Sequence, residues 1–405
     1  MYLMTADRTG AATGAPMVVF GDDWRRFVST IQHLFAHIIT RRRVIWVNSL
    51  GHRAPQLSLY DLRRAASKLR AMAVGYPVVD DGRPRPARVI EPRALPWHNL
   101  AGVRAFNTWS MRRAILAALA EVAPGEAPVL VTGTPAAEGL VGTIGERASI
   151  YFCMDDYAEL PGVDRAIVAP IEERLLDKVD ATVATAAALT TLKKPRAGRV
   201  WHLPQGVNYD HFSAPRPIPP DLAALPSPRI GFSGTMSPAC DLEIFRALSE
   251  AFPQGSIVAV GPVHHVGGEL PTLPNFHALG RKDYADLPAY VQHFDVGIVP
   301  YILSDWTRSV DPLKLLEYMA TGIPVVSTDI PEARKYSEVI SLADGTALFV
   351  DAVRKELAQS ADPAGRARRQ QVAHTNRWER RADRLLEIID EVLASKGTAP
   401  AVQRA

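Results

Sequence analysis

The sequence predicts an α/β protein that contains two doubly wound parallel-sheet domains. Short apolar segments typical of buried strands alternate with amphipathic segments typical of helices, and this alternation occurs twice along the chain. A proline-rich stretch separates the two runs. The 405 residues are enough for two or three domains, and 47% hydrophobic with 22% charged residues is ordinary for a soluble globular protein. Strands alternating with helices favour a parallel sheet covered on both faces.

The first run of elements occupies residues 17–184. Each predicted strand is short and largely apolar: Met17–Phe20, Arg43–Val47, Val129–Val131, Ser149–Phe152 and Ala181–Ala184. Between them the periodicity predicts helices over Asp23–Thr40, Asp61–Met72, Thr108–Val122 and Ile171–Asp180. This order predicts parallel strands joined by helical crossovers.

A linker is predicted next, because seven prolines fall between Pro204 and Pro228 and proline interrupts both helices and central strands. The alternation then resumes with helices beginning at Asp241 and Pro312 and with strands over Arg229–Phe232, Ser256–Val260, Asp295–Val299 and Pro324–Ser327. We therefore assign residues 1–205 to an N-terminal domain and residues 206–375 to a C-terminal domain. A last helix over Trp378–Ala394 precedes a tail, from Ser395, that we expect to be disordered.

Charge is distributed unevenly, although the net charge is only +3. Residues 1–200 contain 26 Lys/Arg against 19 Asp/Glu, a balance of +7, whereas residues 201–405 contain 20 against 24, a balance of −4. The excess includes Arg25, Arg26, Arg41–Arg43, Arg63 and Arg64. This bias indicates that the N-terminal half meets an anionic partner, such as a phosphate-bearing substrate or a lipid surface; a solvated surface of arbitrary bias is an equal alternative.

Several classes of protein are excluded or disfavoured. The sequence contains no run of 18 or more apolar residues, the length that a membrane-spanning helix needs. The first 14 residues also lack an apolar signal core, so we expect a cytoplasmic protein. Cys153 and Cys240 are the only cysteines, and no His, Cys or carboxylate cluster has metal-ligand spacing. We therefore expect no structural zinc, no required metal ion and no cofactor.

The segment Ser309–Val326 carries the clearest chemistry. Asp311 suits an N-cap and Pro312 suits the first helical position, so a helix is expected to start there, with its positive dipole end at the strand tips. Lys314 would add a mobile positive charge, which suits a diphosphate. Glu317 lies three residues further on, on the same helix face, where a carboxylate can accept both hydroxyls of a ribose. An ordinary amphipathic helix with an exposed Lys–Glu pair is the alternative.

Glycine and proline loops follow the strands of the C-terminal domain. Gly231-Phe-Ser-Gly234-Thr-Met236 resembles a phosphate loop, but it lacks the spacing of the known phosphate-binding motifs. A tight strand–helix turn explains it equally well. Gly261-Pro262 and Pro300-Tyr301 occupy the same kind of position, at the carboxyl ends of parallel strands where such sheets bind ligands.

These motifs together resemble one family. Residues 312–326, PLKLLEYMATGIPVV, are similar to the donor-nucleotide helix of GT-B glycosyltransferases. GDDW, YFCMDDY, IEERLLDKVDATVAT, LPQGVN, GFSGTM and DVGIVPY also match, over roughly residues 17–345. The chain resembles bacterial transferases of exopolysaccharide and teichuronic acid assembly, including the xanthan-type glucuronosyltransferases. The resemblance implies two Rossmann-like domains facing a cleft, with the C-terminal helix, in residues 376–405, returning to the N-terminal domain.

The resemblance also implies roles on the donor side. Lys314 would contact the donor diphosphate and Glu317 the ribose. Tyr301 would line the base or ribose pocket, Met236 the side of the diphosphate and sugar, and Arg281 the base pocket. Ser309 lies on the donor side, where the common retaining pattern has a second glutamate eight residues before Glu317. That departure favours an inverting mechanism, whose base comes from the N-terminal domain.

On the acceptor side, the resemblance favours Asp155 over Asp156 as the general base that takes a proton from the attacking hydroxyl. A loop pair that caps the next helix is the alternative. Glu172 matches an acidic position of the family and would contact the acceptor or order the site, unless it is simply an exposed helix residue. Asp23, after the first strand, would contact the acceptor or serve as an N-cap.

The sequence thus predicts transfer of a sugar from a UDP-sugar to a glycan or a polyprenyl-diphosphate-linked acceptor. The basic N-terminal domain would make peripheral contact with the anionic inner face of the cell membrane. No nucleic-acid module is present, so nucleic acid is not an expected partner. Two rival interpretations remain: a nucleotide-sugar 2-epimerase of the same fold, and a non-catalytic protein that only binds a nucleotide sugar.

Overall fold

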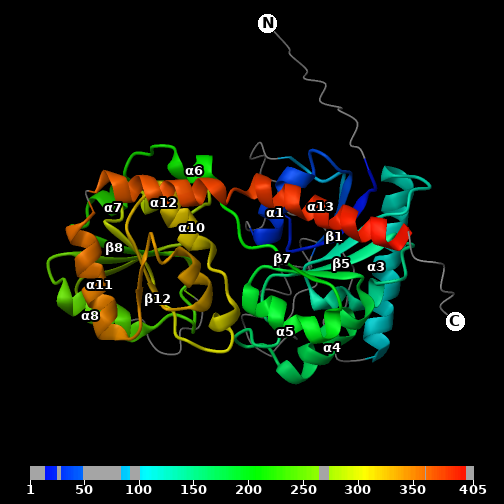
Figure 1. Cartoon of the computed structure of the whole chain (residues 1–405), viewed down its shortest axis with the longest axis horizontal. Helices are drawn as coiled ribbons and strands as arrows, with labels where there is room; N and C mark the ends of the chain where they lie inside the picture. The colour runs from blue at the N-terminus through cyan, green and yellow to red at the C-terminus, as the bar shows by residue number, and fades with distance from the viewer. Residues whose placement is uncertain are drawn as a thin grey trace, which may run out of the picture. The chain divides into compact units, whose positions relative to one another are not determined.

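The computed structural model describes residues 14–24, 29–48, 84–91, 101–263, 273–360 and 362–397. The chain divides into two compact units, each built on one parallel sheet (Figure 1). Unit 1 comprises residues 1–184, 190–203 and 382–405, and unit 2 comprises residues 185–189 and 204–381. The predicted fold class is therefore confirmed. The helix predicted over Asp61–Met72, and Arg25, Arg26, Arg63 and Arg64, lie outside the described residues.

The sheet of unit 1 has the strand order β3-β2-β1-β4-β5-β6-β7, with parallel neighbours throughout. Met17 of β1 lies opposite Val44 on one side and Val129 on the other, so the strand order reverses between β1 and β4. The strands are β1 (Met17–Phe20), β2 (Val44–Val47), β3 (Arg88–Ile90), β4 (Val129–Thr132), β5 (Ala148–Cys153), β6 (Ala181–Ala184) and β7 (Val200–His202).

Helices cover both faces of this sheet, which buries its central strands completely. Val18 and Phe20 pack with residues of α3 and η1, whereas Trp46 contacts Phe35 of α1 edge-on, with ring centroids 6.0 Å apart. The helices with residues in unit 1 are α1 (Thr30–Ile38), α3 (Ala101–Val122), η1 (Pro135–Leu140), α4 (Arg165–Lys178), α5 (Ala187–Ala197) and most of α13 (Trp378–Gly397).

The sheet of unit 2 has the order β10-β9-β8-β11-β12-β13, again with parallel neighbours. Its order reverses between β8 and β11, where Ile230 lies opposite Val296. The strands are β8 (Arg229–Ser233), β9 (Ser256–Val260), β10 (Phe276–Gly280), β11 (Val296–Val299), β12 (Val325–Thr328) and β13 (Ser341–Ala343).

Two separate cores flank the sheet of unit 2, and Figure 1 shows helices on both of its sides. One core packs residues of α6 (Tyr209–Ser213), α7 (Pro220–Ala223), α9 (Leu287–Val291), α10 (Leu313–Thr321) and α12 (Pro363–Thr375). The other packs residues of α8 (Leu242–Ala251) and α11 (Thr346–Ala358). The short helices η2 (Thr307–Ser309) and η3 (Pro331–Tyr336) complete the unit.

Several predicted boundaries were wrong. Helix α1 begins at Thr30 with Ser29 as its N-cap, so Asp23 does not cap it. Helix α4 begins at Arg165, because Asp164 caps it by accepting from the Ala166 amide, and Pro170 lies inside the helix instead of before it. Helix α13 continues to Gly397, so the first residues of the predicted tail are helical. The remainder of that tail lies outside the described residues.

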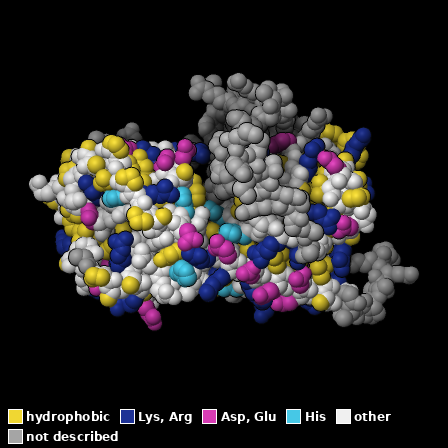
Figure 2. All heavy atoms as spheres, turned by 90° about the horizontal axis from the view of Figure 1, so that it is seen from above, with side chains coloured by type: hydrophobic (Ala, Val, Ile, Leu, Met, Phe, Trp, Pro, Cys, Tyr) yellow, Lys and Arg dark blue, Asp and Glu magenta, His cyan; other side chains and the backbone are white. Residues whose placement is uncertain are grey.

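The arginine run Arg41–Arg43 is paired with carboxylates inside unit 1. Arg43 binds Glu126 through two hydrogen bonds of 2.7 and 2.6 Å, and Arg41 and Arg42 lie beside Asp383 and Asp390 of α13. On the face shown in Figure 2, basic and acidic side chains are likewise interspersed. The positive charge of Arg41–Arg43 is thus balanced by neighbouring carboxylates, which weakens the case that this run binds an anionic partner.

Candidate functional site

The candidate donor site lies where the strand order of unit 2 reverses. The glycine loop after β8 and helix α10, which follows β11, meet there. A Cβ atom on Gly234 would lie only 2.9 Å from the Nζ of Lys314, and Gly234 has a φ of +122°, a conformation that side-chain-bearing residues rarely adopt. The ammonium group of Lys314 therefore lies directly against the glycine loop, at the position where open parallel sheets bind ligands.

Aromatic rings hold Lys314 in this position. Its Nζ lies 3.9 Å from the ring centroid of Phe232 and 5.0 Å from that of Tyr301. Burial opposes the charged form, but the surroundings, Tyr301 foremost, outweigh it and raise the pKa of Lys314. Lys314 is thus a fixed positive charge beside a backbone loop, which suits a diphosphate.

Helix α10 starts one residue later than predicted. Pro312 is its N-cap, and Asp311 does not cap the helix. The Asp311 carboxylate instead accepts from the backbone amide of Gln205 at 3.1 Å and from Lys335 Nζ at 2.8 Å. Asp311 therefore fixes the approach to the helix by tertiary contacts, and the N-terminal amides of α10 have no side-chain cap.

Glu317 is the clearest candidate for a ligand-binding carboxylate. Its side chain is only 7% exposed, and among the described residues it has no hydrogen-bond or ion-pair partner. Burial raises its pKa to about 7, although the charge of Lys314 works in the other direction. A buried carboxylate without a partner is costly in the unliganded protein, and the two hydroxyls of a ribose would satisfy it.

The neighbouring Tyr318 anchors α10 to the end of β8. Its hydroxyl accepts from the Ser233 backbone amide at 2.7 Å and lies 3.1 Å from the Ser233 hydroxyl. Burial raises the pKa of Tyr318 to about 12. This anchor fixes the helix that carries Lys314, which lies against the glycine loop, and Glu317 three residues further on.

The other predicted donor residues lie around the same sheet edge in unit 2. Tyr301 follows β11 and is half-buried, and Arg281 is exposed directly after Gly280, the last residue of β10. Ser309 is 6% exposed, and its hydroxyl donates to the Asp305 carbonyl at 3.5 Å. Met236, the last residue of the glycine loop, is 1% exposed and packs in a hydrophobic core of unit 2. Their roles in binding remain predictions.

The predicted acceptor-side carboxylates lie in unit 1, after β5. Asp155 is half-buried, whereas Asp156 is 7% exposed and pairs with Lys193, its Oδ1 lying 3.1 Å from the Nζ. The two adjacent carboxylates are thus in different environments. Asp155 is the more accessible of the two, which favours it as a proton acceptor.

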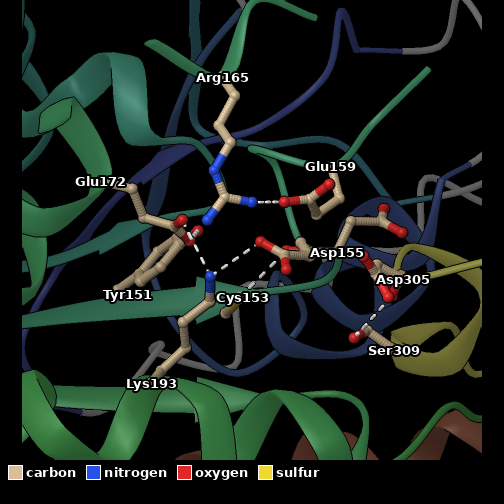
Figure 3. A network of polar contacts seen from close by, with 10 residues as sticks. Tyr151, Cys153, Asp155, Glu159, Arg165, Glu172, Lys193, Asp305 and Ser309 are labelled. Carbon is tan, nitrogen blue, oxygen red and sulfur yellow. Dashed lines mark hydrogen bonds and ion pairs between the residues drawn. The ribbon is translucent and has the colours of Figure 1, made fainter. Parts of the chain in front are cut away.

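Glu172 is not an exposed helix residue, so that interpretation was wrong. It is 4% exposed, accepts from the Tyr151 hydroxyl at 2.7 Å, and lies 2.9 Å from the Nζ of Lys193 (Figure 3). Its carboxylate is therefore occupied inside unit 1. Contact of Glu172 with an acceptor remains a prediction, whereas a part in ordering the site agrees with this geometry.

Asp23 lies just after β1 and is 9% exposed. Its carbonyl accepts from the Gln32 side chain at 3.1 Å, and the neighbouring Trp24 packs on Trp46 with ring centroids 4.7 Å apart. Burial, with a smaller contribution from the charge of Asp23, raises the pKa of Asp22, although a hydrogen bond with Ser29 works in the other direction. These contacts hold the segment after β1 against the sheet, and acceptor binding by Asp23 stays a prediction.

The sequence did not reveal two contributors to these sites. Phe232 was assigned only to a strand, yet its ring supports Lys314. Lys193 lies in α5, a helix that was not predicted and that contains Pro195. The β-strand alternation of Tyr151 and Cys153 could have indicated a buried polar face, but nothing in the sequence pairs that face with Lys193.

Within the described part of the chain, no cluster of three His, Cys, Asp or Glu side chains could hold a metal ion. None of its helices is long and apolar enough to cross a membrane.

The fold and the candidate donor site resemble those of the GT-B glycosyltransferases. Residues 227–362 match the family model described as glycosyl transferases group 1. The chain is also 31% identical over 252 residues to the putative teichuronic acid biosynthesis glycosyltransferase TuaH of Bacillus subtilis, a match that covers 56% of this chain and 63% of TuaH. These findings confirm the predicted resemblance to GT-B glycosyltransferases, and the chain spans about 63% of the length of the curated relative that it matches.

Solved structures share the same architecture. The Anabaena protein HepE, in complex with UDP-glucose, has a TM-score of 0.64 at 13% identity, over 93% of this chain and all of that chain. An α,α-trehalose-phosphate synthase (UDP-forming) from Burkholderia vietnamiensis has a TM-score of 0.61 at 15% identity, over 95% of this chain and all of that chain. At these identities the likeness shows the GT-B fold.

Proposed function

We propose that this protein transfers a sugar from a UDP-sugar to a hydroxyl of a glycan or lipid-linked saccharide. The observation that carries the proposal is the pair on α10: Lys314 against the glycine loop, and a buried Glu317 without a partner among the described residues. A fixed cation and a carboxylate one turn apart match the diphosphate and the ribose of a nucleotide sugar. HepE, which shares the fold, is recorded in complex with UDP and UDP-glucose, and this supports UDP as the nucleotide.

In the proposed reaction, Asp155 takes the proton of the acceptor hydroxyl as its oxygen attacks the anomeric carbon. The bond between that carbon and the diphosphate oxygen breaks, and UDP leaves with the negative charge. Lys314 and the uncapped N-terminus of α10 stabilise that charge. Attack opposite the leaving group inverts the anomeric configuration, in agreement with a serine, Ser309, at the position of the retaining glutamate.

The acceptor is proposed to be a saccharide carried on a polyprenyl diphosphate at the cytoplasmic face of the membrane. The similarity to TuaH, a putative teichuronic acid glycosyltransferase, supports a saccharide. Membrane contact would use basic residues of unit 1 other than the paired run Arg41–Arg43. Sedimentation with anionic vesicles tests this contact, and sedimentation equal to that with neutral vesicles would contradict it.

The function is tested in two stages. Thermal unfolding with UDP-, GDP-, ADP- and dTDP-sugars should show stabilisation by UDP-sugars above all others, since ligands that bind only the folded state raise its melting temperature. Release of UDP in the presence of saccharide acceptors should then depend on Asp155 and give a product of inverted configuration by NMR. Conversion of the UDP-sugar without any acceptor would instead indicate an epimerase.

A further inference from the structure

A buried polar network lies in unit 1, underneath the loop that carries Asp155. Lys193 of α5 is at its centre, 6% exposed, with Nζ 2.9 Å from Glu172 Oε2 and 3.1 Å from Asp156 Oδ1. Tyr151 of β5 donates to the other oxygen of Glu172 at 2.7 Å. Figure 3 shows Tyr151 of β5, Glu172 of α4 and Lys193 of α5 converging on one another.

The burial of this network calls for a functional explanation, because burying a charge costs several kcal/mol per ion before pairing offsets that cost. An apolar cluster would hold α4 and α5 on the sheet at least as well. The network instead fixes one point of the loop, the carboxylate of Asp156, adjacent in sequence to the candidate base. The Asp155 backbone carbonyl is held as well, since it accepts from the Cys153 thiol at 3.4 Å.

The network also carries charge. One ammonium and two carboxylates leave a net charge of −1 beside Asp155. Burial opposes the charge on Lys193, but the surrounding groups, Glu172 foremost, together outweigh it, so the pKa of Lys193 lies above its ordinary value and the side chain stays cationic. In the described part of unit 1, the other titratable groups around this loop include Asp22, Tyr151, Cys153, Tyr157 and the ion pair of Glu159 with Arg165. Burial above all keeps both tyrosines and the thiol neutral, which leaves Lys193 as the buried cation among them.

We propose that Lys193 is a positioning residue for Asp155: it fixes the loop through Asp156 and limits the negative charge beside the base. This inference rests on the proposed function insofar as Asp155 is the base. Lys193 itself touches no reacting atom. Its removal therefore acts in two separable ways, by releasing the loop and by changing the net charge of the network from −1 to −2.

Two variants separate these effects. Lys193→Met removes the clamp and leaves two uncompensated carboxylates. Lys193→Met combined with Glu172→Gln also removes the clamp but restores the net charge of −1. For Lys193→Met we expect kcat to fall about tenfold to a hundredfold with little change in the KM for the donor, since loss of position near a reacting group costs up to about 10² in rate. The apparent pKa of the acid limb of the pH–rate profile should rise by about half a unit or more, because the added negative charge favours the protonated form of Asp155.

In the double variant the pH profile should return towards that of the wild type while kcat stays low. A merely structural role would not shift the profile or reverse the shift. If Lys193→Met does not fold, Glu172→Gln alone serves as the test. It changes the network charge from −1 to 0 and should lower the apparent pKa of the acid limb. The proposal would be overturned if folded Lys193→Met had the kcat and the pH–rate profile of the wild type. It would also be overturned if Glu172→Gln left the apparent pKa of the acid limb unchanged.

A second readout does not need turnover. The carboxyl ¹³C resonance of Asp155, identified by its loss in Asp155→Asn, titrates in the wild type, and its midpoint should rise in Lys193→Met and fall back in the double variant. If the wild type shows no glycosyl transfer, the proposed function fails, yet this titration still decides the role of Lys193. Equal midpoints in the three proteins would refute it.

Discussion

The Nζ of Lys314 lies 2.9 Å from the point where a Cβ atom on Gly234 would stand, so the loop after β8 and helix α10 approach each other as closely as a residue without a side chain permits. Gly261 reinforces this approach, because a Cβ there would lie 2.0 Å from the Gly234 carbonyl oxygen. At these two glycines the loop and α10 thus meet through backbone atoms and the ammonium group of Lys314, and neither position has room for a side chain.

Gly234→Ala should weaken UDP binding and destabilise the protein by about 1–2 kcal/mol, the cost of a Cβ in a positive-φ conformation. The methyl group displaces the end of Lys314, which is flexible, so folding survives while the diphosphate contact is lost. Gly345→Ala is the matched control, since Gly345 has a φ of +90° with no atom within 4 Å of its Cβ position. Equal UDP affinities of the two variants, measured by calorimetry, would contradict this role of Gly234.

Glu317→Gln should stabilise the unliganded protein at alkaline pH while weakening UDP binding. Burial raises the pKa of Glu317 from 4.5 to about 7 in the folded state, so the folded protein binds a proton between these values that the unfolded chain releases. Stability therefore falls as pH rises from 4.5 through 7, by roughly 3 kcal/mol in all.

An amide at position 317 avoids this loss. The melting temperature of Glu317→Gln should exceed that of the wild type at pH 8 and approach it at pH 5. The exposed Glu338 supplies a control, because Glu338→Gln should show no such pH-dependent difference. A Glu317→Gln variant that is less stable than the wild type at pH 8 would show that the carboxylate has a partner.

The two adjacent aspartates should respond differently to amide substitution. Asp155→Asn should reduce transfer by at least about 10², the contribution of a general base, and leave the melting temperature nearly unchanged. Asp156→Asn should lower stability by about 3 kcal/mol, because it removes a partner of the buried Lys193. Chemical denaturation and initial rates of UDP release measure both effects, and the reverse pattern would assign the base to Asp156.

Much of the fold could be predicted because the central strands have a local signature. The buried strands β1, β6 and β9 begin and end where their apolar runs do. The edge strands β3 and β7 were missed, since their three residues are partly exposed and form no apolar run. Their place depends on hydrogen bonds to a neighbouring strand, which a local pattern does not contain.

In the candidate site, too, the features set by local sequence could be predicted, whereas those set by tertiary contacts could not. Lys314 and Glu317 share one helix, so their spacing was visible in the sequence. Asp311 looked like an N-cap, but Lys335 and the Gln205 amide compete for its carboxylate, and both are distant in sequence. The pairing of Lys193 with Glu172 and Asp156 likewise joins residues 21 and 37 positions apart, through contacts that exist only in the folded chain.

The central claim is that α10 binds the diphosphate of a UDP-sugar, and calorimetric titration of UDP into the wild type and Lys314→Ala tests it most directly. Loss of a charge-assisted contact of about 1.5–3 kcal/mol should weaken binding tenfold or more. Lys282→Ala is the control, because Lys282 is paired with Asp221 elsewhere in unit 2. The account predicts one UDP bound per chain by the wild type and by Lys282→Ala, and at least tenfold weaker binding by Lys314→Ala. Equal affinity of all three proteins, or no binding by the wild type, would contradict it.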